Sequence, residues 1–153
     1  MPVVFLAFLV GVLSGLRAFM SLIAVSWAAR LDRLHLGPTH LAFLGYKATP
    51  YIATALGVFE FVADQLPSTP SRKVPKQLLP RLLLAVLAGT AIGLSGGSLL
   101  ACIVLSVIGA LLGTYGGAWA RTVLADFFKK DRPAAVIEDC VAIALAVFVV
   151  VNL

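Results

Sequence analysis

Charged residues are scarce in this sequence. Only 12% of its 153 residues are charged and 61% are hydrophobic, whereas soluble domains are about a quarter charged and about half apolar. This composition excludes a soluble enzyme and a disordered protein. Five membrane helices of about 20 residues would need roughly 100 apolar positions, and 61% of the chain is about 93. We therefore predict an all-α polytopic membrane protein with about five transmembrane helices.

Cysteine and histidine are also scarce, with two of each. Cys102 and Cys140 lie inside apolar runs, where a thiol behaves as a small hydrophobic group. No Cys/His cluster is present, so the sequence predicts no disulfide, no metal site and no cofactor. His35 and His40 share one connector, and no nucleophile or metal set accompanies them. We therefore expect that the protein is not an enzyme.

Basic residues outnumber acidic ones, and most of them stand in two connectors between apolar runs. The first connector contains Arg72, Lys73, Lys76 and Arg81, and the second contains Lys129, Lys130 and Arg132. No aromatic residues alternate with them, which argues against nucleic acid as a partner. The positive-inside rule places both connectors in the cytoplasm. It predicts a multi-pass protein of the cytoplasmic membrane, with its N-terminus inside and its C-terminus outside.

The apolar runs predict one integral-membrane domain over residues 1–153. Pro50 and Pro133 suit the first turn of a helix, and the turn composition of residues 95–98 divides one long run. The expected spans are 3–29, 50–66, 81–94, 99–125 and 134–151.

Glycines recur at four-residue steps in three of these spans. They are Gly11 and Gly15 in the first, Gly89 and Gly93 in the third, and Gly109, Gly113 and Gly117 in the fourth. Residues four apart share one helix face, and small residues allow helices to approach closely in lipid. The pattern predicts helix packing either within one chain or between the copies of a homo-oligomer, and we expect a homo-oligomer.

Charged residues inside the predicted spans are the candidate functional residues. Arg17 lies in the middle of the first span, where a charge costs at least a few kcal/mol. It therefore needs an anionic partner. Glu60 and Asp64 are four apart on the second span, and Glu60 lies about one turn deeper than Asp64. We expect Arg17 to pair with Glu60, either directly or through one water.

A second group of charges lies on the last two spans. Glu138 and Asp139 follow the start of the fifth span, and Arg121 is near the end of the fourth. One interpretation is that these charges line a path for an ion or small solute, so that the protein is a transporter or channel. The alternative is a non-catalytic structural or accessory subunit, in which the same charges are locking ion pairs. The excess of acidic residues favours transport coupled to a cation or proton.

The charged residues also suggest an internal repeat. Spans one and two contain Arg17 and Glu60, and spans four and five contain Arg121 and Glu138. Because one span lies between the two pairs, they would cross the membrane in opposite directions, as in inverted-repeat transporters.

Two short motifs resemble a known family. They are Gly15-Leu16-Arg17-Ala18-Phe19 and the pattern Glu60-x-x-x-Asp64-x-x-Pro67, which is followed by a proline-rich connector. Together they resemble a family of small bacterial integral-membrane proteins that is catalogued only as a domain of unknown function. The resemblance implies a bacterial cytoplasmic membrane and no established activity or substrate.

Overall fold

The computed structural model describes residues 2–63 and 74–153, and this part of the chain is built from helices without a strand. The elements are α1 (Val3–Leu16), α2 (Ala18–Arg30), the short 3-10 helix η1 (Ala42–Gly45), α3 (Thr49–Ala63), α4 (Pro75–Gly96), α5 (Leu99–Phe128) and α6 (Asp131–Asn152). The predicted all-α class is confirmed.

Three helices, α4, α5 and α6, are long and apolar enough to cross a membrane. They have 22, 30 and 22 residues, and at 1.5 Å per residue even the shorter two reach about 33 Å. The sequence predicts five such helices, and that number is too high for the described residues. The apolar helices α1, α2 and α3 are shorter, with 14, 13 and 15 residues.

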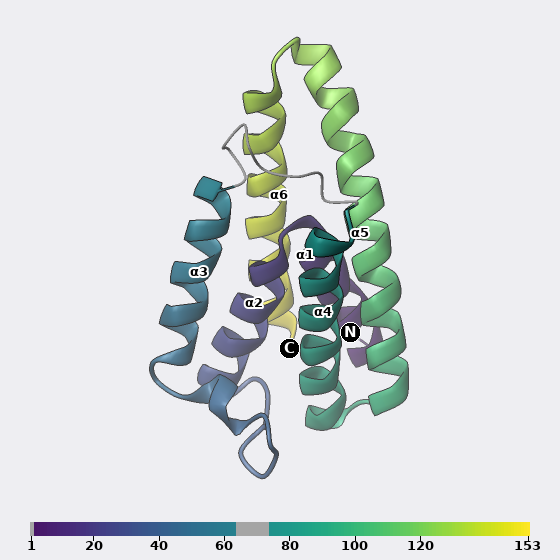
Figure 1. Cartoon of the computed structure of the whole chain (residues 1–153). Helices are drawn as coiled ribbons and strands as arrows, with labels where there is room; N and C mark the ends of the chain where they lie inside the picture. The colour runs from purple at the N-terminus through teal and green to yellow at the C-terminus, as the bar shows by residue number, and fades with distance from the viewer. Residues whose placement is uncertain (1, 64–73) are drawn as a thin grey trace.

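The first predicted span is not one helix, because the chain reverses direction at Arg17. This residue has an extended backbone (φ −142°, ψ 118°) between α1 and α2. α1 rises from the N-terminus to the middle of the molecule, and α2 descends again (Figure 1). Val3, which begins α1, lines the same small pocket as Arg33 and His35, which follow α2. The two helices therefore form a helical hairpin with its tip inside the molecule.

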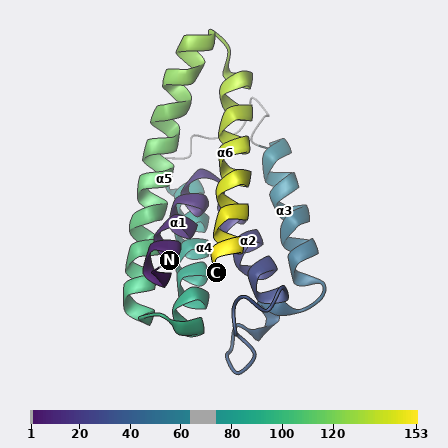
Figure 2. The same ribbon diagram turned by 180° about the vertical axis from the view of Figure 1, so that it is seen from behind.

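The remaining helices surround this hairpin. α3 and α5 run upward in Figure 1, whereas α4 and α6 run downward. α1 packs against α4 and α5, and α2 packs against α3, α4 and α6. The two ends of the chain lie at the same end of the molecule (Figure 2), and Val3 and Leu153 line one pocket. The two termini are thus close together, whereas the sequence predicts them on opposite sides of the membrane.

The glycine steps lie where helix backbones meet within the chain. A Cβ atom at Gly11 would be 2.0 Å from the Ser106 carbonyl oxygen, and one at Gly109 would be 2.3 Å from the Phe8 carbonyl oxygen. Similar close contacts surround the glycines of this set on α1, α4 and α5, namely Gly15, Gly89, Gly93 and Gly113. Gly117 is also buried. No larger residue fits between these backbones, so α1, α4 and α5 form the tightest part of the bundle.

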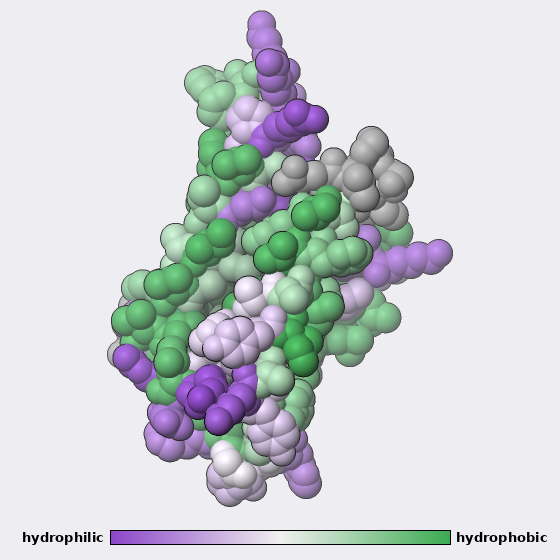
Figure 3. Space-filling model, turned by 90° about the vertical axis from the view of Figure 1, so that its left-hand side faces the viewer, coloured by the Kyte–Doolittle hydropathy of each residue, from purple (hydrophilic) through white to green (hydrophobic). Residues whose placement is uncertain are grey.

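Hydrophobic side chains cover most of the face seen in Figure 3, and hydrophilic ones gather mainly towards its ends. Large apolar residues such as Phe59, Leu100 and Val147 are more than half exposed. An exterior of this kind suits a lipid surrounding better than water.

Candidate functional site

The hairpin tip exposes the ends of two helices inside the molecule. The last carbonyl groups of α1 and the first N–H groups of α2 have no partners within their own helices. The side chains of Glu60, Arg81, Thr114 and Asp139 reach this tip from the four surrounding helices. We use the name tip cluster for Arg17, Glu60, Arg81 and Asp139.

Glu60 caps α2 from the neighbouring helix α3. Its Oε1 accepts a hydrogen bond from the backbone N–H of Ala18 at 2.8 Å, and its Oε2 accepts one from Phe19 at 3.0 Å. Gly57 lies one turn earlier on α3, and a Cβ there would be 2.5 Å from Ile23 Cδ1, so α3 lies close to α2. A carboxylate at a helix N-terminus is stabilised by these bonds and by the helix dipole.

Arg81 caps α1 in the complementary way. Its Nη1 donates to the carbonyl oxygens of Gly15 at 2.8 Å and Leu16 at 2.9 Å. A positive charge is favoured at a helix C-terminus, and this side chain is only 1% exposed. Its Nη2 lies 3.6 Å from Glu60 Oε1, so one ion pair joins the caps of both helix ends. Thr114 on α5 adds a hydrogen bond to the Gly15 carbonyl oxygen at 3.3 Å.

Arg17 pairs with a carboxylate on α6. Its Nε donates to Asp139 Oδ1 at 2.9 Å, and its Nη2 bonds to the same oxygen. The guanidinium carbon lies 5.0 Å from the centre of the Phe61 ring, a distance typical of a cation–π contact. Arg17 thus pairs directly with Asp139, and not directly with Glu60, the partner predicted from the sequence. Glu60 binds the α2 N-terminus and Arg81, because these offer a carboxylate two N–H groups and a cation.

A second charged group lies between the tip and the α5–α6 turn. Arg121 donates from Nε and Nη2 to the two carboxylate oxygens of Asp131, at 2.9 and 2.6 Å. Its Nη1 also lies 3.7 Å from Glu138 Oε2. Adjacent residues on a helix point about 100° apart, so Glu138 faces Arg121 whereas Asp139 faces Arg17.

The structure thus brings together three of the candidate residues, Arg17, Glu60 and Asp139, and places Arg121 and Glu138 in a separate group. Asp64 lies outside the described residues. Sequence reasoning missed Arg81, because it counted this residue with the basic connector. The available signal was its position directly before the apolar run that starts at Leu82. Within residues 2–63 and 74–153, no group of His, Cys, Asp and Glu side chains could hold a metal ion.

Comparison with protein families, with curated proteins and with solved structures finds no match to this chain. The resemblance drawn from the two motifs stays a prediction. A function for this chain is therefore inferred from the geometry of the tip cluster.

Proposed function

We propose that the protein is a small membrane transporter or channel for an ion or small solute, with the tip cluster as its central site. The observation that carries this proposal is the chain reversal at Arg17, which three charged side chains from α3, α4 and α6 hold inside the bundle. Each unsatisfied backbone group inside a membrane costs several kcal/mol. The break therefore requires charged side chains from other helices to bond its two ends, and a bundle with only a structural role would need none of them in a continuous helix.

The proposal places the tip within the hydrocarbon of the bilayer. A Cβ at Gly15 would be 2.3 Å from the Ala110 carbonyl oxygen and 2.6 Å from the Thr114 nitrogen. Along the helix these α5 residues lie about 16–23 Å from Leu99 and about 10–17 Å before Arg121. A hydrocarbon core of about 30 Å fits between Leu99 and Arg121. The tip is then about 10–15 Å from the side that contains the α5–α6 turn.

Broken helices of this kind form the substrate sites of many transporters. Their half-helix N-termini point at anionic groups and their C-terminal ends point at cations. In this chain the Glu60 carboxylate is the anionic group at the N-terminus of α2, and the Arg81 guanidinium is the cation at the C-terminus of α1. When this pair separates, both helix ends become available to a solute or coupling ion. Glu60 and Asp139 are the carboxylates that would carry a proton or bind a cation. The predicted repeat matches the first span with the fourth, but residues 3–29 are broken into two helices whereas α5 is continuous. The proposal does not depend on an inverted repeat.

A structural or accessory role is the second candidate, and one observation favours it. Glu60, Asp139 and Glu138 each lie against an arginine: Arg81, Arg17 and Arg121, respectively. Ion pairs of this kind can fix the arrangement of helices. Under this interpretation the tip cluster stays closed and no solute passes it.

Flux through liposomes tests the proposal. The purified protein is reconstituted with Glu60→Gln beside the parent, and fluxes of protons, sodium, potassium and chloride are recorded. We expect a flux from the parent that Glu60→Gln abolishes, because the neutral amide cannot form and break an ion pair with Arg81. Asp126→Asn, the same change at an exposed carboxyl of α5, is the control and should retain the flux. Equal fluxes from the parent and Glu60→Gln would contradict the proposal.

We also propose a membrane orientation for the bundle. The two basic clusters of the sequence lie between α3 and the start of α4 and between α5 and α6, and the ends of α3 and α5 point away from the termini (Figure 1). The positive-inside rule then places this end of the bundle in the cytoplasm. Because α1 and α2 form a hairpin, the N-terminus follows the C-terminus to the outer side, which reverses the orientation expected from a continuous first span.

A further inference from the structure

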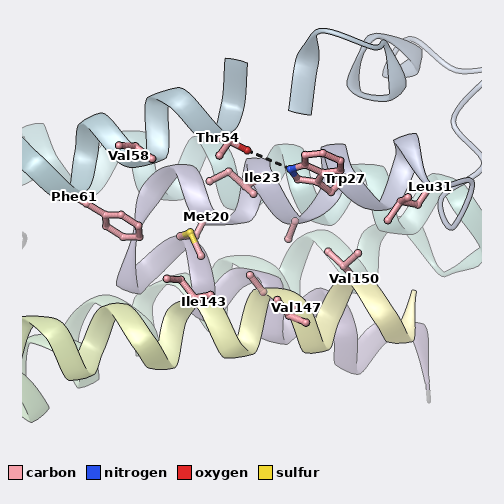
Figure 4. A pocket seen from close by; sticks show the side chains of 12 residues that line it. Met20, Ile23, Trp27, Leu31, Thr54, Val58, Phe61, Ile143, Val147 and Val150 are labelled. Carbon is pink, nitrogen blue, oxygen red and sulfur yellow. Dashed lines mark hydrogen bonds between the residues drawn. The ribbon is translucent and has the colours of Figure 1, made fainter. Parts of the chain in front are cut away.

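An apolar groove of about 470 Å³ lies between α2, α3 and α6. α2 forms its floor, because this helix packs against both of the others. Figure 4 shows the side chains that line it. They are Met20, Ile23, Ala24, Trp27 and Leu31 on and just after α2, Thr54, Val58 and Phe61 on α3, and Ile143, Ala146, Val147 and Val150 on α6.

The lining offers almost nothing polar to a ligand. Its polar side-chain atoms are Trp27 Nε1 and Thr54 Oγ1, and these bond to each other at 3.2 Å. Thr54 Oγ1 also donates to the Pro50 carbonyl oxygen at 2.7 Å. Since both atoms already have partners, a polar ligand would lose its bonds to water without replacing them. The groove therefore suits a hydrocarbon.

The length and the openness of the groove fit a lipid tail. From Met20 to Leu31 the floor extends about 16 Å along α2, close to the roughly 15 Å of hydrocarbon in one leaflet. The walls open sideways, because Val58 is 54% exposed and Val147 is 58% exposed. An occupant can therefore enter from the surrounding bilayer.

Basic side chains stand at the outer end of the groove. Arg30 and Arg33 flank the lining residue Leu31, and both are exposed. Arg33 Nη1 donates to the Val151 carbonyl oxygen at 2.9 Å, next in the chain to the lining residue Val150, and Arg33 also lines the neighbouring small pocket. Asp32 lies between the two arginines, so the mouth keeps one net positive charge. Guanidinium groups suit phosphate.

Aromatic rings mark the same end of the groove as the membrane surface. Trp27 and Tyr51 lie edge to face with centroids 5.4 Å apart, as is common where a helix meets lipid headgroups. A headgroup would then be level with the arginines, and the tail would run inward to Met20 and Phe61.

We propose that this groove binds one acyl chain of an anionic phospholipid, whose phosphate lies at Arg30 and Arg33. The lipid belongs to the leaflet on the side of the two termini. Its tail ends against Phe61, the ring that lies beside Arg17. This binding is independent of whether the protein moves a solute.

Quenching of tryptophan by brominated lipid tests this proposal. The chain has two tryptophans, and Trp119 is 69% exposed on α5, so Trp119→Phe leaves Trp27 as the only probe. This protein is placed in phosphatidylcholine vesicles that contain equal amounts of either brominated phosphatidylglycerol or brominated phosphatidylcholine. We expect the anionic lipid to be preferred about fivefold or more at Trp27, since each arginine near the surface contributes about 1 kcal/mol.

Three variants complete the test. Trp27→Phe leaves Trp119 as the only tryptophan, and its quenching should show no such preference. An equal preference at Trp119 would mean that the anionic lipid is attracted to the whole protein surface, and this would overturn the proposal. Arg30→Gln combined with Arg33→Gln should remove the preference. Ala146→Phe, which places a bulky ring in the groove from α6, should weaken quenching by both lipids. Circular dichroism checks that each variant is folded. Equal quenching of Trp27 by both lipids in the parent would overturn the proposal. So would a preference that survives the arginine changes, or quenching that Ala146→Phe leaves unchanged.

Discussion

Arg17 and Asp139 are a pair in which the arginine is completely shielded from solvent and the aspartate is 16% exposed. Removing one partner of a buried pair leaves the other charge without compensation, which usually costs more than removing both. We expect Arg17→Leu to lower the free energy of unfolding by about 3 kcal/mol. Arg17→Leu combined with Asp139→Leu should lower it less. Denaturant titration in detergent, followed by circular dichroism, measures both.

The control for this prediction is Arg132→Leu. Arg132 is exposed in the first turn of α6, so the same substitution there should change the unfolding free energy by only about 0.5 kcal/mol. If the double variant is less stable than Arg17→Leu alone, the Arg17–Asp139 pair does not have the role described.

At the scale of whole helices, the close contact of α1 and α5 depends on glycine. A Cβ at Gly109 would meet the Phe8 carbonyl oxygen at 2.3 Å, so Gly109→Ala must push the two helices apart. We expect a loss of about 1–3 kcal/mol in the free energy of unfolding, measured by the same titration.

Gly116, on the same helix, provides a matched control of opposite sign. A Cβ there would meet nothing within 4 Å, and alanine is the better helix former by about 1 kcal/mol. Gly116→Ala should therefore leave stability unchanged or raise it slightly. A similar loss from both substitutions would show that intrachain packing at Gly109 is not the cause.

The hairpin is also where prediction from sequence reached its limit. Composition was sufficient for the all-α class, and the cost of a buried charge was sufficient to demand a carboxylate for Arg17. The reversal at Arg17 has no proline or turn motif, and hydropathy over a window cannot distinguish one span from two antiparallel half-helices. Glu60 and Arg81, which stabilise the two helix ends at the break, lie far away in the sequence. Their effect is visible only once the helices are packed.

For the molecule as a whole, the hairpin predicts that both termini lie on the same side of the membrane. In a background with Cys102 and Cys140 replaced by alanine, single cysteines at Pro2→Cys, Leu153→Cys and Lys130→Cys can be treated in intact cells with an impermeant maleimide. We expect labelling at both termini and protection at Lys130, in the α5–α6 turn. Labelling of one terminus without the other would contradict the hairpin.

The expected homo-oligomer stays a prediction at this scale. Six of its seven motivating glycines contact neighbouring backbones or side chains of the same chain, so the glycine steps no longer argue for a contact between copies.

The central claim is that the tip cluster opens to water, and it can be tested without knowing the solute. Ala18 begins α2 beside the Glu60 carboxylate, so Ala18→Cys in the cysteine-free background places a thiol at the tip. The protein is held in nanodiscs, where both faces meet solution, and treated with a charged thiol reagent. Ala88→Cys, a fully buried position of α4, is the control. The account predicts that Ala18→Cys reacts faster than Ala88→Cys. Equally slow reaction at the two positions would contradict it and favour a permanently closed, structural cluster.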